Sequence, residues 1–273
     1  MILITLASFF ILIAMAFLVW RKHIINYTDP KGLLVQGSYA NPERQFEGKL
    51  RTVTWNLHYG ENLDEVITTL EKTDELENAD LLLLQEIDAA GVENIARSLR
   101  YNFIYFPSVF SRQRQKEYGN AILAKWPLYN AENIKLPNRF PGWLENRYAA
   151  KAVINMEGND IIVFSVHLDV VWMKPQGFFL TEEIEKQNDP VILGGDFNTW
   201  QPSSIKTLED GLSSIGLERL TRGTGYTFEA YGAMFILDHI FATESLNHTA
   251  GVFDQTKASD HYPIWAEIVI ESE

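Results

Sequence analysis

The segment VILGGDFN, residues 191–198, is the most informative part of the sequence for the fold. Its first three residues form a short apolar run, which predicts a buried strand because strands covered on both faces read as continuous apolar runs. Two glycines then permit a tight backbone path, and Asp196 and Asn198 follow two positions apart. In an extended segment such residues point to the same side, so one can orient water while the other donates to a phosphate oxygen. A glycine-rich turn with ordinary Asx capping is the alternative.

The same arrangement, a polar residue where an apolar run ends, occurs elsewhere in the chain. Four leucines, residues 81–84, lead into Gln85-Glu86, and a strand-like segment leads into Trp55-Asn56. Ser259-Asp260-His261 stands just before the last apolar run. Polar residues at the ends of neighbouring strands can face a shared cleft, so these short polar motifs predict a single site.

Glu86 is the first candidate metal ligand. A carboxylate at the end of a central apolar strand is costly unless it is paired or bound to a cation, and Mg²⁺ prefers hard oxygen ligands. A solvated glutamate at a strand end is the alternative. The Asn56 amide can support a metal or a water molecule in the same way, although asparagine after a strand is often only a turn former.

Two histidines close segments beside acidic residues. His167 ends the apolar run 161–166, and His261 follows Asp260. A lone histidine is more often structural, but two in such positions favour a catalytic role. A neutral histidine needs a partner that fixes its tautomer, and Asp238 is an available carboxylate. The adjacent His239 is expected on the opposite face of a strand, outside the site.

Composition limits the classes of partner. The 23 basic and 36 acidic residues give a formal net charge of −13, which on average repels polyanions such as nucleic acids. A cationic groove or a bound divalent metal can reverse this field locally. The chain has no cysteine, which excludes disulfides, thiolate nucleophiles and cysteine metal ligands.

The amino-terminal residues read as a separate element. Residues 2–20 are uncharged and mostly apolar, and a helix of that length nearly spans the ~30 Å hydrocarbon layer of a membrane. A cleaved signal peptide is the alternative, with a small-residue site at residues 14–16. No basic residue precedes the run, which favours an uncleaved anchor. The following Arg21-Lys22-His23 favours a cytoplasmic catalytic domain, with export as the alternative.

Residues 1–23 are therefore assigned to an anchor or signal segment, 24–48 to a linker with scattered Pro and Gly, and 49–273 to the folded domain. Within that domain, apolar periodicity predicts strands and helices, and consecutive strands without intervening helices favour antiparallel hairpins. The interleaving predicts an α/β fold of two packed sheets with helices outside. Residues 170–179 are expected to form an apolar loop that touches lipid at the rim of the site or packs on the domain.

Taken together, the motifs resemble the endonuclease/exonuclease/phosphatase superfamily, over residues 50–270 and in the same order. They are Trp55-Asn56, Gln85-Glu86, Tyr118-Gly119-Asn120-Ala121-Ile122, Ser165-Val166-His167-Leu168, residues 194–198, Leu237-Asp238-His239-Ile240 and Ser259-Asp260-His261. The resemblance implies a four-layer α/β/β/α sandwich of two mainly antiparallel sheets, here preceded by a transmembrane helix. It places the active site at one edge of the two sheets.

The resemblance also implies a role for each residue. Glu86 would be the principal Mg²⁺ ligand, with Asn56 and Asp260 beside the metal. Asp196 would align or deprotonate the attacking water. The other implied roles are donation to phosphoryl oxygens by Asn198 and His167, catalysis by His261 paired with Asp238, and substrate contact by Arg147 and Tyr118.

The expected function is a membrane-tethered, Mg²⁺-dependent phosphoesterase, with Mn²⁺ as an alternative metal and a monomeric catalytic domain. A lipid head group or a small phosphate ester is the favoured substrate, since the negative charge disfavours DNA and RNA. The alternatives are a nuclease and a non-catalytic module that binds phosphates. The fold alone does not choose among substrates.

Overall fold

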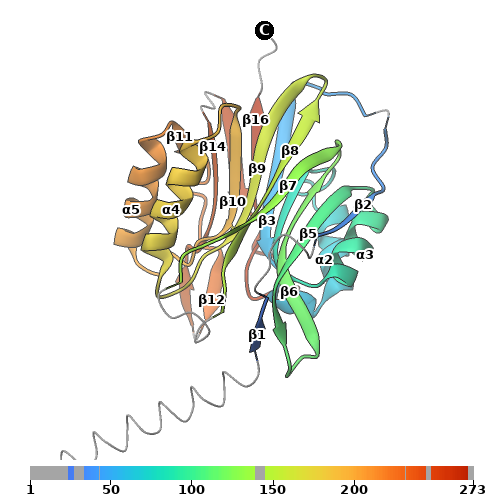
Figure 1. Cartoon of the computed structure of the whole chain (residues 1–273). Coiled ribbons are helices and arrows are strands. Elements are labelled where there is room, and N and C mark those ends of the chain that lie inside the picture. The colour runs from blue at the N-terminus through green and yellow to red at the C-terminus, as the bar shows by residue number, and fades with distance from the viewer. Residues whose placement is uncertain are drawn as a thin grey trace, which may run out of the picture.

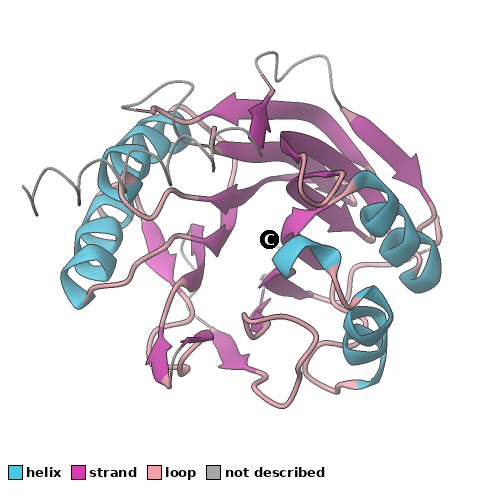
Figure 2. Cartoon of the chain, turned by 90° about the horizontal axis from the view of Figure 1, so that it is seen from below, coloured by secondary structure: helices cyan, strands magenta, loops and turns pink. Residues whose placement is uncertain are grey.

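The structure is a computed structural model that describes residues 24–27, 34–42, 44–138, 145–230, 232–243 and 247–269. Two β-sheets pack face to face, and helices cover the outer face of each sheet (Figures 1 and 2). The chain therefore has an α/β fold with two mainly antiparallel, mixed sheets, as the sequence predicts.

The first sheet has the order β1-β5-β6-β4-β3-β16-β15, and β2 also pairs with β5. Only β3 and β4 run parallel; the other pairs are antiparallel. Its strands are β1 (Ile24–Asn26), β2 (Val35–Ser38), β3 (Lys49–Asn56), β4 (Leu81–Ile87), β5 (Asn102–Ser111), β6 (Lys116–Ala124), β15 (His248–Val252) and β16 (Ile264–Val269).

The second sheet has the order β11-β14-β10-β9-β8-β7, in which β9 and β10 run parallel. A separate hairpin, β12 and β13, lies beside it. The strands are β7 (Leu128–Lys135), β8 (Tyr148–Met156), β9 (Asn159–His167), β10 (Val191–Asp196), β11 (Leu217–Arg219), β12 (Phe228–Ala230), β13 (Ala233–Phe235) and β14 (Asp238–Thr243).

Three apolar clusters hold the layers together. One lies between the sheets and joins residues such as Leu83 on β4 to Val163 on β9. A second packs the first sheet against α2 (Leu63–Lys72) and α3 (Ala89–Leu99), and a third packs the second sheet against α4 (Met173–Glu185) and α5 (Pro202–Ser213). Burial of these apolar faces is what drives a helix–sheet–sheet–helix stack to form.

Several expected segments differ from the structure. Residues 170–179 do not form one loop, because α4 begins at Met173 and carries Phe178 and Phe179. Pro175 lies in the first turn of that helix. Backbone N–H groups in a first turn make no intrahelical hydrogen bond, so the absence of an N–H on proline costs nothing there. The apolar pattern of the sequence did not predict strands β7, β11, β12, β13 and β15. Within the predicted linker 24–48, β1 and β2 pair with β5.

The predicted membrane helix over residues 2–20 lies outside the described residues. None of the helices in the described part of the chain has the length and apolar character needed to cross a bilayer.

The parallel strand pairs bring the polar strand ends together. In the first sheet Asn56 of β3 is opposite Gln85 of β4, and in the second sheet His167 of β9 is opposite Asp196 of β10. The carboxyl ends of parallel strands meet at one edge of a sheet. The two sheets also approach closely near this edge, where Gln85 Nε2 donates to Ser165 Oγ of the opposite sheet at 3.0 Å.

Candidate active site

Asp196 lies at the centre of the polar cluster, at the end of β10. The Asn56 amide donates from Nδ2 to Asp196 Oδ2 at 3.1 Å. His167 Nε2 and His261 Nε2 lie 3.4 and 3.8 Å from the same oxygen. Burial raises the pKa of Asp196 to about 7, although nearby His261 opposes the rise. A carboxylate with this pKa can accept a proton near neutral pH.

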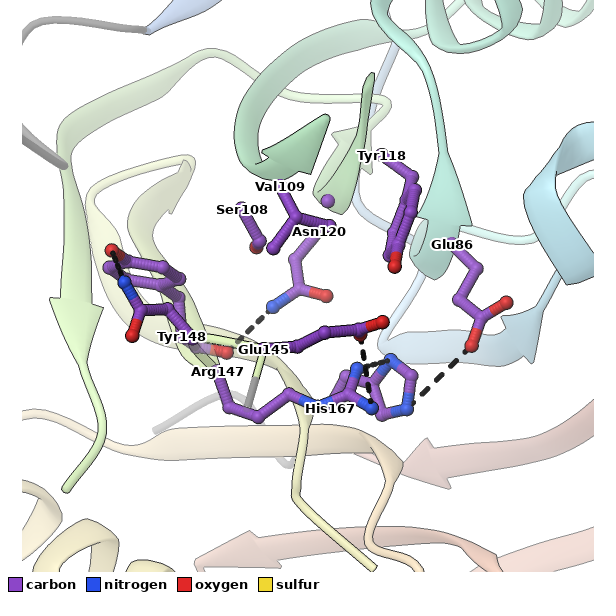
Figure 3. A pocket seen from close by; sticks show the side chains of 11 residues that line it. Glu86, Ser108, Val109, Tyr118, Asn120, Glu145, Arg147, Tyr148 and His167 are labelled. Carbon is purple, nitrogen blue, oxygen red and sulfur yellow. Dashed lines mark hydrogen bonds and ion pairs between the residues drawn. The ribbon is translucent and has the colours of Figure 1, made fainter. Parts of the chain in front are cut away.

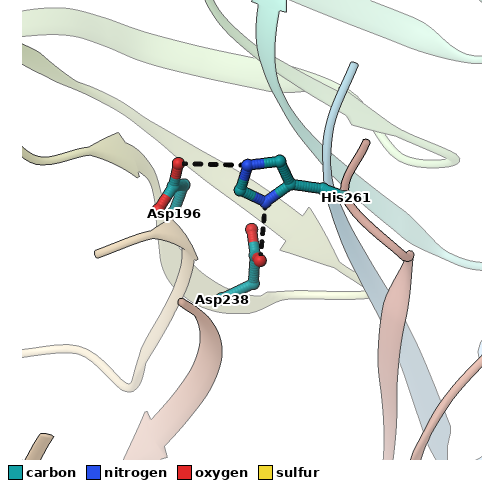
Figure 4. Close-up of side chains that lie close together, drawn as sticks. All are labelled: Asp196, Asp238 and His261. Atoms are coloured by element: carbon teal, nitrogen blue, oxygen red, sulfur yellow. Dashed lines mark hydrogen bonds and ion pairs between the residues drawn. The ribbon is translucent and has the colours of Figure 1, made fainter. Parts of the chain in front are cut away.

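His261 and Asp238 form a buried pair (Figure 4). His261 Nδ1 lies 2.9 Å from Asp238 Oδ2, which leaves Nε2 directed toward Asp196. Burial by itself lowers the pKa of His261, but Asp238 and Asp196 outweigh it and raise the pKa to about 10. Trp55 Nε1 holds the His261 carbonyl at 2.9 Å. The geometry presents a protonated imidazole to the same space that Asp196 faces.

His167 is fixed in the opposite protonation state. Arg147 Nη1 lies 3.0 Å from His167 Nδ1, and because arginine can only donate, that nitrogen must accept. The neutral ring therefore carries its hydrogen on Nε2, which faces Asp196 and, at 3.8 Å, Glu86 Oε1 (Figure 3). Burial and then Arg147 lower the pKa of His167 well below its ordinary value.

Glu86 sits where β4 is interrupted by a bulge, with a φ of 52°. The bulge turns its side chain into a pocket that Arg147 and His167 also line (Figure 3). Burial raises the pKa of Glu86, with Arg147 opposing, and Asn56 donates a hydrogen bond to the carboxylate. A carboxylate in a site that penalises its bare charge fits a hard divalent cation. The Asn56 Oδ1 does not face Glu86 here, because it accepts the His58 N–H at 3.1 Å.

A second set of residues also has ligand atoms close enough together to bind one metal ion. Ligand atoms of Asp196, Asp238 and His261 all lie within 4.8 Å of one another. In this group, however, Asp238 is already bound to His261 Nδ1. An Asp–His hydrogen bond that leaves the other ring nitrogen free is the arrangement expected of a proton donor, so we favour Glu86 as the metal ligand.

Asp260 lies beside this centre. Its carboxylate accepts from His58 Nδ1 at 3.0 Å, and its side chain is 39% exposed. Burial alone would raise the pKa of Asp260, but the hydrogen bond from His58 and the charges of His261 and His58 together outweigh it and lower the pKa. The adjacent Ser259 hydroxyl donates to the Asn56 carbonyl at 2.7 Å, which ties this loop to the end of β3. Asp260 thus faces the rim near Asn56.

Asn198 has a left-handed backbone, with a φ of 51°, and is not part of an extended segment. Its backbone N–H donates to Asp196 Oδ1 at 2.9 Å, so the turn that caps the strand also orients Asp196. Its side-chain Nδ2 donates to the Leu168 carbonyl, and its Oδ1 accepts from Trp200 Nε1. One amide hydrogen remains for a substrate oxygen.

The glycines before Asp196 serve strand packing. A Cβ on Gly194 would lie 2.7 Å from Leu83 Cδ1 of the other sheet. A Cβ on Gly195, whose φ is +153°, would lie 1.9 Å from the Val166 carbonyl oxygen. The predicted close backbone path is therefore real, but its neighbours are β4 and β9, not a ligand.

Arg147 and Tyr118 line the pocket, in which Glu145 also lies (Figure 3). Arg147 Nη2 lies 3.6 Å from Glu145 Oε2, and the Tyr118 hydroxyl points toward the same carboxylate. Burial, followed by Glu145, raises the pKa of Tyr118. Sequence analysis did not identify Glu145, because no periodic run leads into it. It also missed His58, although that residue follows the end of β3 by only two positions.

Buried acids, a neutral histidine, a charged histidine and an arginine around one space define a class of site that cleaves phosphate esters with water. Residues 53–261 match the Endonuclease/Exonuclease/phosphatase family, and the chain belongs to that family. The resemblance seen in the motifs is therefore confirmed.

Two curated relatives match parts of the chain. The UPF0294 protein YE0917 of Yersinia enterocolitica is 34% identical over 106 residues, 38% of each chain. The UPF0294 protein plu0699 of Photorhabdus laumondii is 35% identical over 81 residues, 30% of each chain. The matched regions thus span about a third of the length of these relatives.

Solved structures share the fold. An endonuclease/exonuclease/phosphatase family protein from Bacteroides thetaiotaomicron superposes with a TM-score of 0.65 at 18% identity, over 82% of this chain and 99% of that chain. The D. rerio TDP2 complexed with single strand DNA product gives a TM-score of 0.64 at 18% identity, over 81% and 99%.

Proposed function

We propose that this chain is a Mg²⁺-dependent phosphoesterase in which Asp196 activates water and His261 donates to the phosphate. The observation that carries this proposal is the convergence of three strand ends and the loop before β16 on Asp196 Oδ2, with Asn56, His167 and His261 around it. Near neutral pH this carboxylate can take a proton from water, and His261 can give one to an oxygen that gains charge.

Glu86 and Asn56 would hold the cation, and Asp260 is the nearby carboxylate that faces the rim. When bound, a divalent cation would neutralise charge on the phosphoryl oxygens. Neutral His167 can donate from Nε2, Asn198 from its remaining amide hydrogen, and Arg147 from its guanidinium. Because these donors are held in place before the reaction, they stabilise the negative charge of the transition state better than bulk water does. Mn²⁺ has the same ligand preference and is an alternative to Mg²⁺.

The substrate we favour is a lipid head group or a small phosphate ester, with the enzyme tethered to a membrane by residues 1–23. The supporting observations are the apolar residues 2–20 and the charge of −13. Val171 and Phe178 are 75% and 56% exposed, and Val171 lies in the short loop that follows His167. Apolar side chains at such a rim can contact a bilayer. Met173 is buried, so only part of this segment is free to do so.

A nuclease is the second candidate. The observation that favours it is the shared fold with D. rerio TDP2, which was solved with a single strand DNA product. The negative charge of this chain weakens it, because phosphate contacts by Lys and Arg dominate affinity for nucleic acids. A non-catalytic phosphate-binding module is disfavoured, since the acids and histidines keep distinct protonation states that binding alone does not need.

Two substitutions test the proposal. Asp196→Ala and His261→Ala should each lower kcat by about two orders of magnitude or more, the scale found for catalytic groups. Thermal unfolding should show that both variants fold. Asp210→Ala removes an exposed carboxylate on α5 and serves as the matched control, with normal turnover expected. Near-normal metal-dependent hydrolysis by both site variants would refute the assignment.

A substrate screen separates the candidates. The chain should be assayed with Mg²⁺, and again with EDTA, on phospholipid and sphingomyelin vesicles, generic phosphate mono- and diesters, plasmid DNA and RNA. EDTA-sensitive cleavage of lipids or small esters supports the favoured substrate class. Cleavage of DNA or RNA at low enzyme concentration would favour the nuclease, and silence on every substrate would favour the binding module.

A further inference from the structure

The segment 24–27, which precedes the family match at residue 53, lies directly against the wall of the catalytic pocket. The Asn146 backbone N–H donates to Asn26 Oδ1 at 2.7 Å, and Asn146 Nδ2 donates to the Tyr27 carbonyl at 3.2 Å. The Tyr148 hydroxyl donates to the same carbonyl at 2.7 Å. Three hydrogen bonds therefore join this segment to the two neighbours of Arg147.

On its other side the segment is fixed to the first sheet. β1 pairs with the end of β5, and the Tyr27 N–H donates to the Ser108 carbonyl at 3.2 Å. The Tyr27 hydroxyl donates to Glu117 Oε2 on β6 at 3.1 Å. Ser108 itself lines the pocket. The segment thus connects the first sheet to residues 146–148, which enter β8 of the second sheet.

Arg147 depends on the geometry of these residues. Its guanidinium contacts His167 Nδ1 at 3.0 Å and Glu145 Oε2 at 3.6 Å, and only 15% of its side chain is exposed, so a small backbone shift would weaken these contacts. From the other side this stretch is held by the ladders with β7 and β9 and by two hydrogen bonds. The Leu136 N–H donates to the Arg147 carbonyl at 3.0 Å, and the Asn120 amide donates to the Tyr148 carbonyl at 2.7 Å. The Asn146 backbone N–H has Asn26 as its partner.

We propose that Asn26 and Tyr27 are positioning residues that hold Arg147 in place for the phosphoryl group of the substrate. This inference rests on the proposed function, in which Arg147 contacts that group. It assigns a role in the reaction to a segment outside the matched family region. Positioning of this kind is sensitive to shifts of about an ångström, because contacts with a charged group weaken steeply when their geometry is lost.

The test uses the full chain carrying Asn26→Ala, which removes the acceptor for the Asn146 N–H. Loss of one such hydrogen bond should lower kcat/KM roughly tenfold, chiefly through a higher KM, since Arg147 binds the phosphoryl group before and during the reaction. Ile25→Ala is the matched control. That side chain lies on the same strand, is 41% exposed and pairs away from the pocket, so its kcat/KM should be normal.

A double-mutant cycle separates positioning from a general structural effect. In an Arg147→Ala background, Asn26→Ala should change kcat/KM less than about twofold, because the residue it positions is already gone. An equal loss in both backgrounds would overturn the inference. Hydrogen exchange gives a readout apart from activity: the Asn146 amide should exchange roughly tenfold faster in Asn26→Ala than in the wild-type chain. Unchanged exchange would also overturn it.

Failure of this inference is distinguishable from failure of the proposed function. Normal hydrolysis by Arg147→Ala, with Asp196→Ala inactive, would overturn the positioning role and leave the proposed function standing. If the wild-type chain hydrolyses no phosphate ester, the proposed function is refuted, and this inference is refuted with it.

Discussion

His261 is the residue whose protonation state is set most directly by its neighbours. The carboxylates of Asp238 and Asp196 raise its pKa to about 10, while burial raises the pKa of Asp196 to about 7. Catalysis as proposed needs Asp196 deprotonated and His261 protonated. Activity should therefore rise as pH increases through about 7 and fall through about 10, with both values belonging to the coupled pair.

Asp238→Asn tests which carboxylate controls the alkaline limb. The substitution removes one negative charge from His261 and keeps the shape of its partner. The His261 pKa should fall, so the alkaline limb of kcat/KM should move to lower pH while the acid limb changes less. Measured kcat/KM profiles of the two proteins check this, and an unmoved alkaline limb would contradict the role assigned to the Asp238–His261 pair.

Glu86→Gln tests the metal site. The amide keeps the size of the side chain and removes the charge that a divalent cation would bind. The Mg²⁺ concentration for half-maximal activity should rise by about tenfold or more, the scale of losses at metal sites. A titration of activity with Mg²⁺ measures it. Glu61→Gln, an exposed carboxylate that pairs with Arg114, is the control, and equal effects of the two substitutions would argue against Glu86 as a ligand.

Single residues explain why the polar residues predicted at the strand ends lie together in the structure. Glu86, His167 and Asp196 each follow an apolar run, and parallel pairing brings such ends to one edge. Asn198 was assigned to the site for a partly incorrect reason, since its backbone is left-handed and not extended. The sequence pattern did not predict Glu145 as a site residue. Its place in the pocket depends on Tyr118, which is distant in sequence, and on the loop that also carries Arg147.

At the scale of secondary-structure elements, β10 shows how strand packing and catalysis are joined. Gly195 lets β10 approach β9 so closely that a Cβ would meet the Val166 carbonyl oxygen at 1.9 Å. This approach places Asp196 opposite His167. A side chain at this position would push the two catalytic strand ends apart.

Gly195→Ala should therefore lower the free energy of unfolding by at least about 2 kcal/mol, from the positive φ together with the clash. Gly158→Ala is the matched control, because Gly158 also has a positive φ, of +98°, but nothing lies within 4 Å of its Cβ position. That variant should lose only about 1 kcal/mol. Urea unfolding of both proteins measures the difference, and equal losses would show that the contact with Val166 matters little.

The elements also show where local patterns misled. Residues 170–179 were expected to form an apolar loop, yet α4 begins at Met173, and Pro175 lies in its first turn, where its ring costs no hydrogen bond. β1 and β2 are too short to show periodicity, and they exist because β5 offers them an edge. Such elements depend on a tertiary partner.

For the whole molecule, the position of β1 matters most. Figure 1 shows β1 at one end of the molecule. Its last residue, Asn26, and the following Tyr27 contact residues beside the candidate site. Any anchor formed by the preceding residues would therefore start close to the catalytic pocket. This arrangement suits a substrate presented at a membrane surface.

Removing residues 1–23 tests the proposed tether. The shortened chain keeps Asn26 and Tyr27, so its hydrolysis of a soluble phosphate ester should be unchanged, whereas its co-sedimentation with phospholipid vesicles should be lost because the apolar run is gone. Activity assays and vesicle sedimentation of both chains measure this. Equal sedimentation of the two chains would contradict the tether.

The amino-acid sequence was sufficient to predict the family, the α/β class and a set of polar side chains that lie together, because apolar runs and the polar residues at their ends are local patterns that a strand must obey. The protonation states of His167 and His261, the place of Glu145 and the contact of residues 24–27 with the pocket emerged only from the folded arrangement. Those properties depend on burial and on charges brought together from distant parts of the chain, which no local pattern records.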